Sequence, residues 1–265
     1  MSRTDPEAVA ALFEETERVL AEERKRMDEE REAMEAFRET VREISPEKAL
    51  TSESRPALQV RTGSETTSFD SIRAAYESTF MAVDHHEEDY DETYIESVTE
   101  EFGPDMAVLL ATGTEFTVQH KRVLLSGINQ AVERRESVFE ELQTEMRSIR
   151  EAAPVLVSIA TELTRMENDI DGTVSPDVLD AYEMRLNVLL DKCNQLLVER
   201  QSTVVTQRRK LSLPLDAVDV PEYVYSRADF EATYPVLSTL ATLTAALETL
   251  GLADTNRELS PPVSD

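Results

Sequence analysis

The sequence predicts an all-α protein, an elongated helical bundle with a long N-terminal coiled-coil-like helix. Three observations support this fold class. Glycine is scarce, at 6 of 265 residues. Glu, Ala, Leu and Arg, which favour helices, are abundant. Apolar residues also recur at helical spacing along most of the chain. We therefore expect six or seven helices around a core supplied by the 40% of residues that are hydrophobic.

Residues 1–44 are expected to form one long amphipathic helix, started by the Thr-Asp-Pro of residues 4–6 and ended by residues 45–46. Its seam repeats at spacings of four and three residues, as in coiled coils: Val9, Phe13, Thr16, Leu20, Glu23, Met27, Glu30, Met34, Phe37, Val41 and Ile44. Glu23 and Glu30 break the seam, so each is either partly solvated or paired with a basic residue such as an arginine. A stripe this long needs a partner surface, either the bundle itself or another chain.

Residues 45–67 read as a polar linker, rich in Ser and Thr and marked by Pro46, Pro56 and Gly63. We place the helical bundle at 68–252. The remaining residues, 253–265, are expected to be a disordered tail.

The bundle is expected to begin with a helix at Ser68 and to break at residues 84–85. Residues at four-residue spacing mark the next helix: Tyr90, Tyr94, Val98 and Phe102. That helix should end at Gly103, and a short helix over 104–111 should follow.

A long helical tract is expected between Gly113 and about Ile170. Apolar residues recur in it every seven positions: Leu142, Ile149, Leu156, Leu163 and Ile170. Pro154 should kink this tract or split it in two. The next helix should start at residues 175–176 and end near Leu211.

The end of the chain is expected to hold a loop and one more helix. Residues 212–226 are apolar but broken by prolines, so the loop should lie across the bundle. The last helix should run over 227–250, with Gly251 as its cap.

The charge is strongly acidic, with 54 acidic against 27 basic residues and a formal net charge of −27. Of the basic residues, five are lysines: Lys25, Lys48, Lys121, Lys192 and Lys210. This composition is typical of proteins from salt-accumulating cells, where a Debye length of about 3 Å at molar salt screens the repulsion. The alternative is an acidic protein of ordinary cytosol with a basic partner.

The same composition bears on partners and location. Excess acid argues against non-specific nucleic-acid binding, which needs Lys and Arg to neutralise phosphates. A single cysteine, Cys193, fits a reducing cytoplasm. The longest apolar-leaning stretch, 236–252, contains Glu248 and several Ser and Thr residues, so we expect no membrane span.

The most distinctive local feature is the stretch 74–120, which holds twelve acidic residues and no Lys or Arg. At its centre, residues 85–92 read His-His-Glu-Glu-Asp-Tyr-Asp-Glu. His85 and Asp89 would face one cation if this segment is helical. The functional interpretation is a metal site, or a docking face for a basic partner. The alternative is a solvated acidic helix with buried tyrosines. Neither zinc-site spacing nor paired Glu-x-x-His motifs are present, so no metal site is assigned.

Weaker binding candidates complete the set. With His85 and Asp89 we include four more residues: His86, Tyr90, Tyr223 and Tyr234. The last two cluster with Tyr225 and either rim a pocket or pack in the core. Cys193 lies between Leu189 and Leu196 on an apolar lane and is expected to be a packed small hydrophobe.

Catalytic motifs are missing from the sequence. There is no glycine-rich phosphate loop, nucleophile elbow or H-E-x-x-H motif. We therefore assign no catalytic residue and no cofactor. The leading hypothesis is a non-enzymatic interaction or scaffold protein whose first helix binds a protein partner or a second copy; a regulatory partner of a larger complex is not separable from it. The alternative is a ligand- or metal-binding bundle, enzymatic in one version, that uses residues 85–92.

Several strings give the chain a resemblance to a family: 75–83 (Ala-Tyr-Glu-Ser-Thr-Phe-Met-Ala-Val), 86–90 (His-Glu-Glu-Asp-Tyr), 101–104 (Glu-Phe-Gly-Pro) and 230–237 (Phe-Glu-Ala-Thr-Tyr-Pro-Val-Leu). Their order resembles an uncharacterised family of haloarchaeal helical proteins, known as a domain of unknown function. The resemblance covers most of the chain. It implies a haloarchaeal origin and a helical fold, and it supplies no activity, ligand or catalytic residue.

Overall fold

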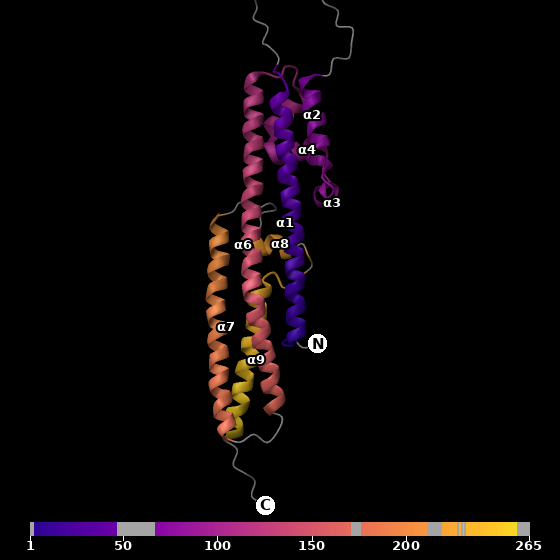
Figure 1. Ribbon diagram of the computed structural model, residues 1–265. Helices are drawn as coiled ribbons and strands as arrows, with labels where there is room; N and C mark the ends of the chain where they lie inside the picture. Colours follow the sequence, from indigo (N-terminus) through magenta and orange to yellow (C-terminus); the bar gives the residue numbers. More distant parts are fainter. Residues whose placement is uncertain are drawn as a thin grey trace, which may run out of the picture. The chain divides into compact units, whose positions relative to one another are not determined.

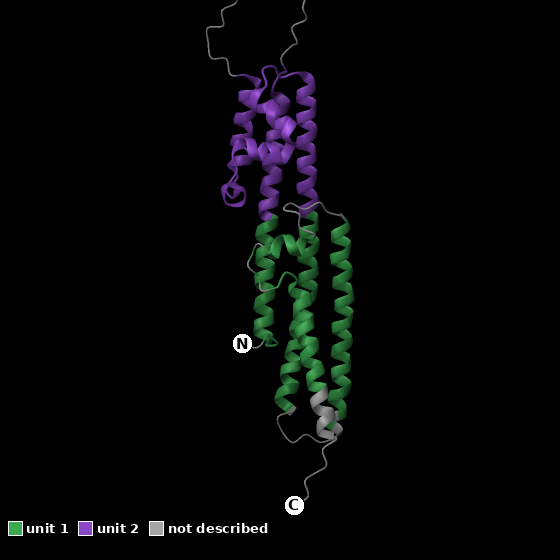
Figure 2. Ribbon diagram, turned by 180° about the vertical axis from the view of Figure 1, so that it is seen from behind, with its two compact units in different colours: residues 1–24, 140–265 green, residues 25–139 purple. Residues whose placement is uncertain are grey.

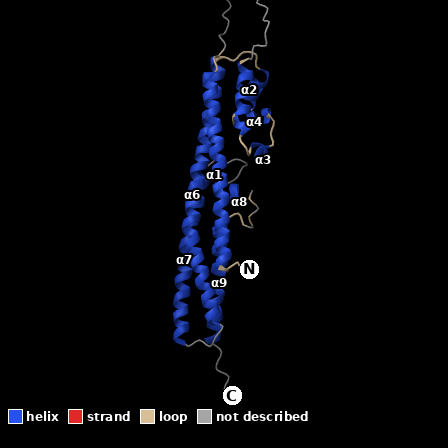
Figure 3. Cartoon of the chain, turned by 45° about the vertical axis from the view of Figure 1, so that its right-hand side comes forward, coloured by secondary structure: helices blue, strands red, loops and turns tan. Residues whose placement is uncertain are grey.

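A computed structural model describes residues 3–46, 67–170, 176–210, 219–226, 228, 230 and 232–258. These residues form helices and connecting loops without a strand, as Figure 3 shows, so the all-α prediction is confirmed. The elements are labelled in Figure 1 and follow in chain order: α1 (Pro6–Glu43), α2 (Ser68–Ser78), η1 (Phe80–Ala82), α3 (His86–Tyr90), α4 (Tyr94–Phe102), α5 (Pro104–Thr112), α6 (Val118–Ile170), α7 (Pro176–Lys210), α8 (Val220–Tyr225) and α9 (Pro235–Glu258).

The chain divides into two compact units, coloured separately in Figure 2. Unit 2 is residues 25–139, and unit 1 combines residues 1–24 with 140–265. The long helices α1 and α6 each contribute residues to both units. Most of the predicted linker, 47–66, and the end of the predicted tail, 259–265, lie outside the described residues.

Unit 2 has an aromatic core between α1, α2, α4 and α6. Tyr76 is at its centre, with ring contacts to Phe37 (centroids 5.2 Å apart) and Phe102 (5.9 Å). Its hydroxyl shares a hydrogen bond of 2.9 Å with Ser97 Oγ. Lys121 of α6 donates to the carbonyl oxygens of Arg42 and Ile44, which satisfies the C-terminal end of α1.

The expected single helix through Tyr90 and Phe102 is wrong. The structure ends α3 at Tyr90 and starts α4 at Tyr94. Asp91 adopts a left-handed conformation (φ 45°), which stops α3. Thr93 and Glu96 then form a reciprocal capping box that begins α4.

Unit 1 is built from α7, α8 and α9 with the beginning of α1 and the second half of α6. Its core includes Leu156 of α6, Leu189 of α7 and Leu243 of α9. Glu17 of α1 accepts a hydrogen bond from Arg150 Nε of α6 at 2.8 Å. The helices α7 and α9 are in direct contact.

Pro154 does not split α6, which continues from Val118 to Ile170. Buried residues repeat at seven-residue steps on both sides of the proline, with Ala152 and Ile159 in one lane and Ile149 and Leu156 in the next. Pro154 has no backbone N–H, so one helical hydrogen bond is lost. The buried residues before and after it continue the same lanes, which holds α6 together as one helix.

The predicted end of the chain needs two corrections. Residues 220–225, expected within a loop, form α8, because Asp219 accepts a hydrogen bond from Glu222 N at 2.9 Å and Pro221 suits the first turn. The last helix begins at Pro235 instead of Arg227 and continues through Gly251 to Glu258.

Candidate functional site

The candidate site in unit 2 is centred on Glu30, one of the two charged residues in the seam of α1. Its neighbours along the seam, Met27, Met34 and Phe37, are buried, and so is Glu30 itself. The helix therefore places a carboxylate where an apolar side chain is expected. Since a buried carboxylate needs hydrogen-bond donors and a counter-charge, its partners define the site.

Three donors surround the Glu30 carboxylate. The Tyr90 hydroxyl donates to Oε1 at 3.0 Å, and His85 Nε2 lies 3.3 Å from the same atom. Arg135 Nε of α6 donates to Oε2 at 2.9 Å. The expected alternative in which Glu30 pairs with an arginine is therefore confirmed. We call Glu30, His85, Tyr90, Arg135 and Glu101 the Glu30 network.

Arg135 connects Glu30 to α4. Its Nη1 donates to Glu101 Oε2 at 3.1 Å, and its Nη2 contacts Glu101 Oε1. Its guanidinium carbon also lies 4.7 Å from the centroid of the Phe80 ring, a cation–π distance. One buried cation thus pairs with two carboxylates from different helices.

His85 and Asp89 lie one helical turn apart, because Asp89 N donates to the His85 carbonyl at 2.9 Å. His85 Nδ1 is 3.5 Å from Glu29 Oε2, and Arg26 Nη1 donates to Asp89 Oδ1 at 2.6 Å. Ligand atoms of Glu30, His85 and Asp89 lie within 4.8 Å of one another. The structure thus brings the two residues predicted to face one cation together with Glu30.

These contacts shift the pKa values of His85, Glu30 and Tyr90. The hydrogen bond to Glu30 raises the pKa of His85 above its ordinary value, against the effect of burial. Burial favours a higher pKa for the Glu30 carboxyl, but His85 and Arg135 outweigh it, so the pKa of Glu30 lies below its usual range. Burial also raises the pKa of the Tyr90 hydroxyl, which stays a donor. The network therefore favours a protonated His85 beside an ionised Glu30.

His86 differs from its neighbour. It is buried, and its ring lies 5.3 Å from that of Phe80 and 5.2 Å from that of Tyr90. Its Nε2 has no hydrogen-bond partner among the described residues. Burial lowers the pKa of His86, so this ring packs as a neutral aromatic group.

Comparison with known protein families identifies the family of this chain. A family model described as "Domain of unknown function (DUF7260)" matches residues 11–250. The chain belongs to this family. The resemblance drawn from the sequence is confirmed to that extent. Neither a curated protein nor a solved structure matches the chain.

This member of the DUF7260 family has a related arrangement in unit 1, centred on Glu145 of α6. Arg200 of α7 forms a bidentate pair with it, with Nη1–Oε2 at 2.8 Å and Nη2–Oε1 at 2.5 Å. The Tyr225 hydroxyl donates to Oε1 at 3.1 Å, and Gln207 Nε2 lies 3.5 Å from Oε2. We call these four residues the Glu145 network.

The tyrosine candidates of the DUF7260 chain separate into different settings. Tyr234 donates to Asp219 Oδ2 at 3.0 Å and accepts from Arg208 Nη2 at 2.9 Å. Tyr223 is buried in α8, two positions before the Tyr225 of the Glu145 network. Cys193 is buried on the apolar lane of α7, and burial raises the pKa of its thiol.

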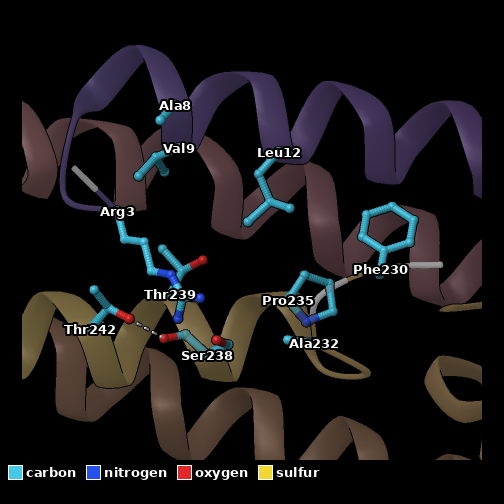
Figure 4. Close-up of a pocket in the computed structure, with 10 residues that line it drawn as sticks. All are labelled: Arg3, Ala8, Val9, Leu12, Phe230, Ala232, Pro235, Ser238, Thr239 and Thr242. Carbon is cyan, nitrogen blue, oxygen red and sulfur yellow. Dashed lines mark hydrogen bonds between the residues drawn. The ribbon is translucent and has the colours of Figure 1, made fainter. Parts of the chain in front are cut away.

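A cavity of about 230 Å³ lies in unit 1 between α1 and α9. Figure 4 shows Val9 and Leu12 on one side and Pro235 and Thr239 on the other, with Phe230 at one end. Neither Tyr223 nor Tyr234 is among the residues that line it. Its lining combines apolar side chains with Arg3, Ser238, Thr239 and Thr242, and the sequence analysis did not single out this position.

The sequence contained a signal for one arginine in each network, and the sequence analysis missed it. Arg135 lies seven residues before Leu142, in the same buried lane of α6. Arg200 lies seven residues after Cys193, in the buried lane of α7. A charged residue at a seam position predicts a buried ion pair, but the lane does not reveal which carboxylate it meets.

Proposed function

We propose that the chain is a non-enzymatic helical interaction protein of a high-salt, haloarchaeal cytoplasm. The observation that carries the proposal is the distribution of exposed apolar side chains. Among the described residues, α7 presents five large hydrophobic side chains to solvent: Val178, Met184, Val188, Val198 and Val205. Four of them, from Met184 onward, fall on one face of the helix at the spacing of a coiled-coil seam, which favours an interaction surface.

The first helix is less suited to this role than its seam predicts. The seam residues from Val9 to Val41 are buried in the chain, with the exception of Glu23, which is half-buried. The seam therefore already has its partner surface. A partner that binds α1 would contact its outer face, where charged residues such as Arg18 and Glu22 form exposed pairs.

The cytoplasmic and halophilic parts of the proposal are supported by composition. The net charge is −27, with five lysines among 27 basic residues. Within the described residues, no helix combines the length and apolar character that crossing a bilayer requires. Dilution from molar KCl to tens of millimolar should lower the helical circular dichroism, because the carboxylates are then unscreened. An unchanged spectrum contradicts the halophilic part.

Crosslinking in cells tests the interaction role. The lysines Lys192 and Lys210 lie on α7, while Lys25 and Lys121 lie elsewhere and serve as an internal comparison. A lysine-reactive reagent, followed by mass spectrometry in molar KCl, should join α7 to another chain. Crosslinks confined to one chain would contradict the proposal.

A second candidate function is cation binding at Glu30, His85 and Asp89. It is favoured by the 4.8 Å spacing of their ligand atoms. Arg26 and Arg135 already neutralise the two carboxylates, so a cation has to displace Arg26 and the His85 proton. Affinity should therefore rise with pH. Thermal shift with divalent cations tests this, with His85→Gln as the variant and His120→Gln as the matched control. No shift and no bound metal would remove this candidate.

A further inference from the structure

The exposed apolar residues of α7 follow a regular pattern. From Met184 to Val205, residues alternate at spacings of four and three: Met184, Val188, Asp191, Gln195, Val198, Ser202 and Val205. All seven are exposed, with Met184 67% and Val198 66% accessible. We call these residues the outer seam of α7. It has the repeat of a coiled-coil interface, and it runs for about three heptads.

The outer seam is separate from the surface that α7 uses inside unit 1. The buried lane of α7 contains Leu186, Leu189, Cys193, Arg200 and Val204. In Figures 1 and 2, α7 lies at the edge of unit 1 with α9 beside it. The helix thus has one seam occupied within the chain and a second one facing solvent.

Charge distinguishes this part of the helix from the rest of the molecule. Residues 184–210 contain two acidic and six basic residues, although the chain as a whole has 54 acidic and 27 basic residues. At molar salt the repulsion between two copies is screened beyond about 3 Å, so only charges that meet across an interface affect how the copies pair. Three of the six bases are already paired within the chain: Arg185 with Glu162, Arg200 with Glu145 and Arg208 with Asp219. The other three bases and the two acids leave this stretch close to neutral, so two copies can meet along it with few like charges in contact.

The ends of α7 carry opposite charges. Its first turns contain the exposed Asp180 and Glu183, and its last turn contains the exposed Arg209. An antiparallel pair places the acidic end of each helix beside the basic end of the other. A parallel pair places like charges together, which is unfavourable.

From these observations we infer that a second copy of the chain binds along the outer seam, so that two α7 helices pair antiparallel in a homodimer. The inference rests on the proposed interaction role and names the partner. In this arrangement, Val188 of each copy faces Val198 of the other. Asp191 faces Gln195 of the other copy, and such a polar rung fixes the register of paired helices.

The first test is the mass of the chain in molar KCl, measured by sedimentation equilibrium. The wild type should have twice its chain mass of 29.9 kDa. Val198→Lys should weaken the dimer by about tenfold or more, because it places a charge where Val198 meets Val188 of the other copy. Val108→Lys on α5 is the matched control, since Val108 is a valine of similar exposure, at 63%. Circular dichroism confirms that each variant is folded. A monomeric wild type, or equal effects of the two variants, would overturn the inference.

Disulfide formation tests the orientation. A mixture of Val188→Cys and Val198→Cys chains should form a disulfide between the two variants, whereas Val198→Cys alone should form little. The wild type, whose Cys193 is buried, is the negative control. Efficient disulfide formation by Val198→Cys alone would indicate a parallel pair and overturn the antiparallel arrangement.

The outcomes separate this inference from the proposed function. A monomer whose α7 is crosslinked in cells to a different protein would overturn the homodimer and leave the interaction role standing. A monomer without crosslinks to any other chain would overturn both.

Discussion

The Glu30 network of unit 2 and the Glu145 network of unit 1 both stabilise a buried glutamate, but with different sets of partners. Each holds a buried glutamate with an arginine from another helix and a tyrosine hydroxyl. In unit 1 both members of the ion pair are shielded from solvent: Glu145 is 0% exposed and Arg200 is 3% exposed. In unit 2 the network also contains His85, which can gain or lose a proton. The comparison separates a fixed ion pair from one whose charge depends on pH.

The largest expected effect is the loss of Arg200. Arg200→Ala leaves Glu145 buried without a cation, which should lower the free energy of unfolding by about 4–5 kcal/mol. Urea unfolding in molar KCl measures this change. The double variant Glu145→Met/Arg200→Met replaces the pair by apolar side chains of similar length and should cost much less. A double variant as unstable as Arg200→Ala would contradict a simple ion-pair role.

Arg135→Ala should cost less, about 3 kcal/mol in the same experiment. His85, when protonated, remains beside Glu30 as a replacement cation, and Glu101 keeps its contact with Arg134 at 3.0 Å. The loss should therefore be smaller at acidic pH than at alkaline pH. Equal costs for Arg135→Ala and Arg200→Ala at all pH values would remove the distinction between the two networks.

The smallest expected effect comes from His85. Because its pKa is raised in the folded state, its contribution to stability is complete below the ordinary value of about 6.5 and is lost as the pH rises through the folded pKa. His85→Gln should cost about 1–2 kcal/mol at acidic pH and little at alkaline pH.

Urea unfolding across this pH range measures the difference. His120→Gln is the control, since the His120 ring is hydrogen-bonded within the local turn at Thr117. A cost of His85→Gln that does not change with pH would show that the ring acts through packing alone. His86 should show the opposite pH dependence. Its pKa is lowered in the folded state, so protonation of His86 at acidic pH should destabilise the fold.

Much of this architecture could be predicted because burial follows the seven-residue spacing. The seam of α1 and the start of α2 at Ser68 were read from the sequence, and Glu30 stood out as a charge among apolar seam residues. The break at Asp91 and the short α8 were missed, because each depends on a local cap that involves few residues.

The partners of Glu30 were beyond prediction for a different reason. Arg135, His85 and Tyr90 lie 55 to 105 positions away in sequence. Spacing within one helix identifies which face is buried, but it does not say which residue of another helix lies opposite. Some acidic residues of the stretch 74–120, which has no Lys or Arg, pair with arginines outside it: Asp89 with Arg26 and Glu101 with Arg134.

The composition of unit 1 has a consequence for synthesis on the ribosome. Residues 1–24 of this unit are made before residues 25–139, whereas the rest of the unit comes after residue 139. Unit 2, a continuous segment, can fold as soon as residue 139 has emerged. Val9, Phe13 and Leu20 therefore stay exposed until the rest of unit 1, more than a hundred residues later in the chain, has been made. Within unit 1, the apolar surface that is made first is therefore the last to be buried.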